Sequence, residues 1–256
     1  AGTSNINLRG LGVASTLVLL NNKRQVVTAQ PTNEGLNFVD TSSLVPMIAI
    51  DRMEVVKDGA SALYGSDAVA GVVNFITKRN YDGAMVSVDY QDGAHGDNKE
   101  YILQGLWGAT GDNGSVLAAI SYTNRSPLFL SDRRLSRPQD DTSALGNPGS
   151  YFLNIPGAGP LPIIDPYGCE EFGGAPDLRA PSGTIPGLEV GFCGFDFGKF
   201  YSYVADESRT NAYVRADYEF DNDITWTAEF STARNRAERG GAPSFPILTS
   251  PIVPDY

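Results

Sequence analysis

Residues 51–78, DRMEVVKDGASALYGSDAVAGVVNFITK, constrain the fold more than any other part of the chain. Within them, Met53–Val56 and Val69–Ile76 are β-branched runs bounded by Gly, Asp and Ser, which predicts two short buried strands. The residues between, Gly59–Tyr64, favour a turn of helix, and Gly65 is expected to end it in a left-handed conformation. Taken alone, this order of elements also suits a small α+β module of a soluble enzyme.

Two upstream segments accompany this stretch: NINLRG (Asn5–Gly10) and TLVLLNNKRQV (Thr16–Val26). Together the three segments resemble the plug domain of TonB-dependent outer-membrane receptors, over residues 5 to about 83. The resemblance implies a plug inside a transmembrane barrel of about 22 strands, external loops that capture a scarce solute, and a TonB protein that displaces the plug. The sequence has Asn21-Asn22 where this family often has Asp-Gly, which still suits a hairpin turn because Asn tolerates positive φ.

After residue 83 the sequence alternates between apolar and polar residues, as segments 84–91, 209–220 and 224–231 show. In a soluble antiparallel sheet the polar residues of such a pattern face water. In a transmembrane barrel the apolar residues face lipid and the polar residues line the lumen. Alternation alone leaves both structures open. The apolar set includes Val86, Val214, Ala216 and Trp226, and the polar set includes Arg209, Arg215, Asp217, Glu219 and Glu229.

The connections between these strands differ greatly in length. Gly111–Gly114 and Asp221–Asp223 are tight, whereas about eighty residues rich in Pro, Gly, Asp and aromatics separate Arg125 from Arg209. Barrels of the bacterial outer membrane have short periplasmic turns and long external loops. Outward-facing aromatics fall into two levels that resemble interfacial girdles. Trp107, Tyr218, Phe220 and Trp226 lie beside the tight turns, and Tyr90, Tyr101 and Tyr122 lie toward the long segment.

The expected fold is therefore mainly β. We expect a small α+β plug domain at residues 1–80, and at 81–256 about five antiparallel strands of the transmembrane barrel with a long external loop at about 126–208. Because five strands cannot close a barrel, we expect further residues at both ends, including an N-terminal part of the plug, in the same protein or in another chain. The net charge of -11 argues against a nucleic-acid-binding surface.

Two cysteines, Cys169 and Cys193, lie in the expected external loop. A disulfide between them suits an oxidising periplasm and restrains the enclosed hairpin by about 3 to 4 kcal/mol, and two free thiols are the alternative. Metal ligation is disfavoured because His95 is the chain's one histidine. The sequence contains neither a Gly-x-Ser-x-Gly elbow nor a Walker lysine motif. We expect no catalytic residues, cofactor or metal, and hence no enzyme.

The resemblance also implies charged plug residues that pair with the barrel wall. On that basis Arg9, Arg52, Glu54 and Lys57 are the candidates for latching the plug. Arg52 and Lys57 can equally pair with local carboxylates. A movable plug is expected to meet the wall through hydrated polar contacts, because an apolar interface is hard to separate.

Aromatic side chains of the long segment can stack on a solute or form the segment's own core. The substrate-binding candidates are Tyr151, Tyr167, Phe195 and Tyr201. A siderophore, cobalamin, an oligosaccharide or a peptide all fit. The expected location is the bacterial outer membrane, with TonB, membrane lipid and the solute as partners. Two other readings stay open: a structural or adhesive outer-membrane protein with a permanent plug, and a secreted β-rich hydrolase, for which no catalytic cluster is found.

Overall fold

The chain forms two compact units, residues 1–127 with 205–238, and residues 128–204 with 239–256. Among the residues described, no helix has the length and apolarity needed to cross a membrane. The computed structural model describes residues 2–29, 31–32, 34–57, 61–93, 98–132, 142–143, 150–155, 159–164, 169–171, 174–176, 183–185, 188–191, 193–197, 200–221, 224–241 and 249–251.

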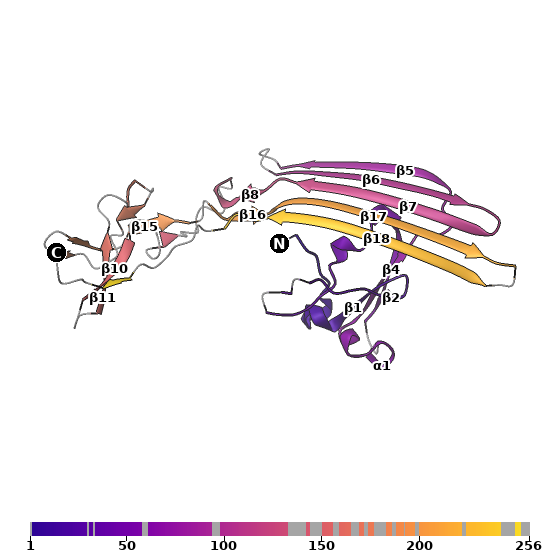
Figure 1. The fold of residues 1–256 in the computed structure, drawn as a ribbon, viewed down its shortest axis with the longest axis horizontal. Coiled ribbons are helices and arrows are strands. Elements are labelled where there is room, and N and C mark those ends of the chain that lie inside the picture. Colours follow the sequence, from indigo (N-terminus) through magenta and orange to yellow (C-terminus); the bar gives the residue numbers. More distant parts are fainter. Residues whose placement is uncertain are drawn as a thin grey trace. The chain divides into compact units, whose positions relative to one another are not determined.

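The first unit begins with an N-terminal domain, residues 2–78, built on a four-stranded sheet of order β2-β1-β4-β3 (Figure 1). The central strands β1 and β4 are parallel, and the outer pairs are antiparallel. The predicted strands and helical turn are confirmed. The strands are β1 (Thr16–Leu20), β2 (Lys23–Arg24), β3 (Ile50–Val56) and β4 (Gly71–Thr77). The helices are α1 (Ser61–Tyr64) and five 3-10 helices, η1 (Leu8–Gly10), η2 (Val13–Ser15), η3 (Thr41–Ser43), η4 (Met47–Ala49) and η5 (Ser66–Ala68).

Residues with positive φ close the turns of this domain where the sequence predicts them. Asn21 and Asn22 have φ of 49° and 67°, and they join β1 to β2 in a two-residue hairpin that pairs Leu20 with Lys23. Gly65, which follows α1, has φ of 85°. Asn and Gly tolerate this left-handed region better than other residues do, so the chain reverses here without strain.

The two predicted strands of residues 51–78 differ in burial. β4 lies between β1 and β3 and is buried, as predicted. β3 is an edge strand whose side chains are exposed, for example Met53 at 54% and Val56 at 45%, so the prediction of burial is wrong for it. A β-branched run favours the extended backbone, but burial depends on neighbours, and an edge strand has a neighbour on one side alone.

The first unit continues with a five-stranded antiparallel sheet of long strands, in the order β18-β17-β7-β6-β5 (Figure 1). Tight connections at 111–113 and 220–224 join β6 to β7 and β17 to β18, as predicted. This sheet and the N-terminal domain confirm the predicted fold class. The strands are β5 (Gly83–Asp92), β6 (Lys99–Thr110), β7 (Gly114–Arg125), β17 (Asp206–Glu219) and β18 (Thr225–Glu238).

The two faces of this sheet differ in character. The inner face contacts the N-terminal domain and buries polar residues of β17 such as Asn211 and Arg215. The strand register places the large apolar residues together on the opposite, outer face, where they are exposed. The predicted alternation is therefore confirmed, with the polar row turned inward. The outer face carries Val86, Val88, Leu103, Trp107, Ile120, Tyr122, Val214, Tyr218, Trp226 and Phe230.

The second unit is built of short strands. A disulfide joins Cys169 to Cys193, which confirms the predicted bridge. β8 (Leu128–Phe129), which η6 (Leu130–Asp132) follows, pairs with β16 (Ser202–Val204). A three-stranded sheet contains β12 (Ala175–Pro176), β15 (Cys193–Asp196) and β9 (Thr142–Ser143). A five-stranded sheet contains β13 (Gly183–Ile185), β14 (Leu188–Val190), β11 (Gly159–Ile164), β10 (Ser150–Ile155) and β19 (Thr249–Pro251).

Candidate functional site

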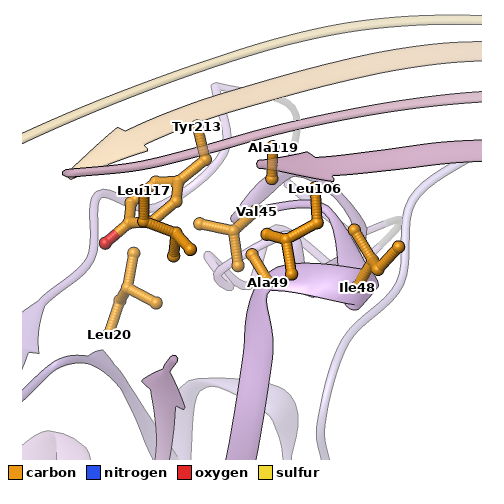
Figure 2. Close-up of a cluster of buried hydrophobic side chains, with 8 residues drawn as sticks. All are labelled: Leu20, Val45, Ile48, Ala49, Leu106, Leu117, Ala119 and Tyr213. Atoms are coloured by element: carbon orange, nitrogen blue, oxygen red, sulfur yellow. The ribbon is translucent and has the colours of Figure 1, made fainter. Parts of the chain in front are cut away.

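An apolar seam joins the N-terminal domain to the inner face of the sheet (Figure 2). Four of its side chains come from β1 and the segment around η4, and four come from β6, β7 and β17. None is more than 9% exposed. Burial of a Leu or Ile side chain stabilises a fold by about 1.5 to 3 kcal/mol, so this is a strong attachment. The seam consists of Leu20, Val45, Ile48 and Ala49 on the domain and Leu106, Leu117, Ala119 and Tyr213 on the sheet.

The seam corrects the expectation that this interface is polar and hydrated. That expectation is wrong where the inner faces of β6 and β7 carry Leu106, Leu117 and Ala119, although Gln104 on β6 accepts the backbone N–H of Ile48 at 3.1 Å. It holds for β17 and β18, whose inner faces carry charged groups in contact with the N-terminal domain. The polar row that is clear in residues 209–220 is mixed with apolar residues on the inner faces of the preceding two strands. The interface is therefore apolar on one side and polar on the other.

Glu229 on β18 is the centre of the polar side. Its carboxylate accepts hydrogen bonds from Asn21 Nδ2 at 2.7 Å and from Arg215 Nη1 at 2.6 Å, and it pairs with Lys23 Nζ at 2.9 Å. Arg215 also makes two bonds to Asp217, of 2.5 and 2.7 Å. The Arg215 side chain is 4% exposed and that of Glu229 is 12%. Charges this well buried need partners, because desolvation of an unpaired ion costs several kcal/mol.

Asn21 connects the hairpin turn to this centre. Its side chain accepts a bond from the backbone N–H of Thr77 at 3.0 Å and donates to the hydroxyl of Tyr213 at 3.2 Å as well as to Glu229. An Asp at this position has no N–H to donate and places a second carboxylate against Glu229. Asn21 therefore matches Glu229, the acidic residue that it meets on β18.

Further polar contacts lie toward the other end of β17. Asn211 Nδ2 donates to the Ser42 carbonyl at 2.8 Å, and Arg209 Nη2 donates to the Gly2 carbonyl at 3.2 Å. The side chain of Asn235 on β18 also donates to the Gly2 carbonyl. These bonds use backbone carbonyls of the N-terminal domain. They can be exchanged for bonds to water at modest net cost.

Asp40 organises the segment that meets β17 there. Its carboxylate accepts the backbone N–H of Ser4 at 2.9 Å and that of Ser42 at 3.2 Å, together with the hydroxyls of Ser42 and Ser43. Burial raises the pKa of this carboxyl, but the hydrogen bonds outweigh burial, and the net pKa lies below the usual 3.8. Asp40 is therefore ionised at neutral pH and acts as the N-cap of η3.

The four predicted latch residues lie elsewhere on the N-terminal domain. Arg52 pairs with Asp51 at 3.0 Å and with Glu54 at 2.9 Å, all on β3, and these bonds, Asp51 first, raise its pKa. Lys57 follows β3 and is exposed. Arg9 lies in η1, is also exposed and has a positive φ of 59°. The structure brings Arg52 and Glu54 together, and a latch role for the four stays a prediction.

The predicted substrate-binding aromatics are only partly described. Phe195 is 5% exposed and packs against Phe197 and Phe200, with ring centroids 4.8 and 5.8 Å apart. Tyr201 is 38% exposed. The side chain of Tyr151, on β10, and the whole of Tyr167 lie outside the described residues. Phe195 thus belongs to a small aromatic core of the second unit, and solute binding by these residues stays a prediction.

Sequence reasoning missed the contact between Asn21, Lys23 and Glu229. The alternation of β18 places Glu229 on the polar, inner side, but it does not identify a partner more than 200 residues away, since Asn21 and Glu229 are 208 positions apart. The Asn21-Asn22 pair predicts the hairpin turn that carries two of the three residues. The pair alone does not identify the residue of the sheet that Asn21 contacts.

Comparisons with known proteins agree on one family. The family model described as TonB-dependent Receptor Plug Domain matches residues 1–72. An iron-regulated outer membrane virulence protein of Vibrio cholerae serotype O1 is 40% identical over 78 residues, which is 30% of this chain and 12% of the relative. A probable TonB-dependent siderophore receptor, PirA of Acinetobacter baumannii, is 37% identical over 99 residues, or 37% of this chain and 13% of the relative.

A solved structure is also similar, at a lower level. It is a mutant of the ferric enterobactin receptor PfeA of Pseudomonas aeruginosa in complex with enterobactin. The match has a TM-score of 0.42 and 17% sequence identity, and it covers 90% of this chain and 34% of that chain.

Proposed function

We propose a transport function on one premise: this chain belongs to the TonB-dependent receptors, whose plug-domain model matches residues 1–72. One relative is named as an outer membrane virulence protein and another as a probable TonB-dependent siderophore receptor, and the chain is an outer-membrane protein. It spans about an eighth of the length of these curated relatives, 12% and 13%. The activity, substrate and partners of the whole receptor are therefore our proposals.

The proposed activity is active import across the outer membrane. Residues 1–80 form the plug, residues 81–256 begin the barrel wall, and the segment at about 126–208 lies outside and captures the solute. TonB then displaces the plug from the periplasmic side. Among siderophores, cobalamin, oligosaccharides and peptides, we favour a ferric siderophore, because one relative is named as a siderophore receptor and another as iron-regulated.

One observation carries this proposal. β17 turns most of its polar row toward the N-terminal domain and the sheet exposes an apolar row, as Arg215 at 4% and Val214 at 42% illustrate. A soluble sheet has the opposite arrangement. A wall that is apolar outside and polar inside, with a folded domain on the inside, is the arrangement that a gated membrane channel needs.

The polar and apolar sides of the interface suggest how such a gate works. The contacts of Asn21 and Lys23 with Glu229, and those of Gly2 and Ser42 with β17, can pass to water when the plug moves. Water cannot replace the apolar contacts of the seam in this way. Exposure of the seam to water therefore removes the stabilisation that apolar burial provides. We therefore propose that displacement begins at the polar contacts and leaves the seam for last.

Uptake of labelled iron tests the transport proposal. A strain that lacks the gene receives the full-length receptor and is offered radioactive iron bound to catecholate, hydroxamate or mixed-ligand siderophores. We expect uptake of one class, and its loss when TonB is deleted or a protonophore removes the energy supply. Uptake that is equal with and without TonB contradicts the gate, and lack of uptake for every class contradicts the siderophore proposal.

Charge reversal tests the predicted latch on β3. Because Arg52 and Glu54 pair with each other, the variants Arg52→Glu and Glu54→Arg each break that pair, and the double variant restores it with opposite polarity. If these residues also hold the wall, each single variant and the double variant increase leakage of large antibiotics. If the pair is purely local, the double variant restores the barrier. Unchanged permeability in all three counts against the latch.

A second function has an observation in its favour. The seam is apolar and buried, as expected for a plug that never leaves, which suits a structural or adhesive outer-membrane protein with a permanent stopper. TonB dependence separates the two functions. A permanent stopper gives no TonB-dependent uptake of any solute, and the same cells bind a surface partner whether or not TonB is present.

A further inference from the structure

A hollow of about 700 Å³ opens on the outer face of the five-stranded sheet, at the tight-turn ends of β6, β7, β17 and β18. Its floor is made of small residues, Ala109, Gly111, Gly114 and Ala216, and its lining is overwhelmingly apolar. The volume falls in the range of roughly 300 to 1,000 Å³ that is usual for ligand pockets. Other parts of the outer face carry large side chains such as Leu103, Ile120 and Phe230.

Close packing of the backbone leaves no room for a side chain at Gly114, one residue of this floor. Gly114 lies directly opposite Tyr218 in the register of β7 and β17. A Cβ atom at Gly114 would lie 2.6 Å from the Asp217 carbonyl oxygen and 3.2 Å from Cδ2 of Tyr218. A larger residue therefore does not fit at Gly114, and this part of the floor stays without a side chain.

Aromatic side chains form one side of the hollow. Tyr218 and Phe220 meet edge to face with ring centroids 4.8 Å apart, and Trp226 lies opposite Tyr218 in the register of β17 and β18. Tyr218 and Trp226 are 44% and 53% exposed. Within the described part of the chain, the Tyr218 hydroxyl and the Trp226 indole N–H have no hydrogen-bond partner. Such rings favour the membrane interface, with the apolar ring in hydrocarbon and the polar group near headgroups.

We propose that this hollow binds one acyl chain of a glycerophospholipid, with the Tyr218 hydroxyl and the Trp226 N–H donating to its ester or phosphate oxygens. The hollow continues the apolar outer face of an outer-membrane protein, so a membrane lipid is the molecule that meets it. Short turns of such barrels lie on the periplasmic side, which makes a phospholipid of that leaflet the occupant. The proposal rests on membrane location and not on transport.

Retention of phospholipid by the purified receptor tests the site. The full-length receptor is extracted in detergent, exchanged into mild detergent with added phosphatidylethanolamine, and examined by native mass spectrometry. We expect one phospholipid to stay bound to the wild type after the washing that removes bulk lipid. Ala216→Leu fills the floor and is expected to lower retention about tenfold. Ala212→Leu is the matched control, because Ala212 lies on the same strand and face but outside the hollow.

A second variant separates lipid binding from folding. Tyr218→Phe keeps the ring and the packing but removes the hydroxyl, and loss of one hydrogen bond predicts a decrease in retention of about two- to tenfold. Equal retention by wild type, Ala216→Leu and Tyr218→Phe overturns the site, as does preferential retention of lipopolysaccharide. Since neither measurement involves uptake, a failure of this proposal is distinct from a failure of the transport proposal.

Discussion

The inner and outer faces of the five-stranded sheet bury and expose opposite kinds of side chain. On β17, Arg215 is 4% exposed while its neighbour Val214 is 42% exposed. On β6, both Leu106 and Leu103 are apolar, yet the first is 2% and the second 50% exposed. Polarity therefore does not decide burial in this sheet. What decides it is the partner of each face, which is the N-terminal domain inside and, as we propose, lipid outside.

This difference separates two kinds of stabilisation. On the inner face, the buried charged groups of β17 and β18 are stable because each meets an opposite charge, and the apolar groups of the seam are stable because they exclude water. On the outer face, apolar groups are stable in hydrocarbon, where a charge is costly. The same substitution should therefore have different effects on the two faces of one strand, which gives matched pairs of variants.

The largest effect is expected from Arg215→Ala. This change takes the cation from the partly buried Asp217 and leaves Glu229 with Lys23 alone, and removal of one partner from a buried pair typically costs about 3 to 5 kcal/mol. Chemical unfolding of the full receptor in lipid vesicles measures the loss. The control is Arg236→Ala on β18, whose ion pair with Glu238 is exposed and contributes little. Equal losses in the two variants contradict the burial of the Arg215 network.

A cavity in the seam is expected to have the next largest effect. Leu106→Ala removes a fully buried side chain between the sheet and the N-terminal domain and is expected to lower the free energy of unfolding by about 2 to 5 kcal/mol. Leu103→Ala is the same change on the outer face of the same strand. It leaves a cavity open to lipid and should cost less than Leu106→Ala. The two variants are compared by the same unfolding measurement. A larger loss of unfolding free energy for Leu103→Ala contradicts the assignment of Leu106 to the buried face and Leu103 to the exposed face.

A charge on the outer face tests whether that face meets lipid. Val214→Arg places a guanidinium where the proposal puts hydrocarbon, at an expected cost of about 2 to 4 kcal/mol near the bilayer midplane. Val214→Leu keeps the position apolar and is the control. The readout is the free energy of unfolding in lipid vesicles, together with the yield of folded receptor in the membrane. If both variants are equally stable, the outer face does not meet lipid at this position.

Much of this arrangement can be predicted from the sequence. The features that cannot be predicted share one cause. The alternation in 209–220 predicts which side chains of β17 turn inward, and Asn21-Asn22 predicts its hairpin, because both depend on neighbouring residues. The exposure of β3, the seam around Val45 and the partner of Glu229 depend on residues distant in the sequence. No local pattern shows that a run such as Met53–Val56 lies at a sheet edge, or that Leu106 meets another domain.

The smallest effect is expected for Asp40, which belongs to the hydrated end of the interface and not to the seam. Its pKa is below the usual 3.8 in the folded protein, so its ionised form contributes stability that is complete above that value and is lost as the pH falls through the lower, folded pKa. Hydrogen exchange of the Ser4 and Ser42 amides, measured from pH 5 downward and corrected for intrinsic exchange, should show protection that weakens in this range. Asp40→Asn should flatten that dependence, while the amides of β1 beside the seam keep theirs. Loss of protection at both places together would mean that the polar and apolar sides of the interface separate as one unit, and the distinction between them would fail.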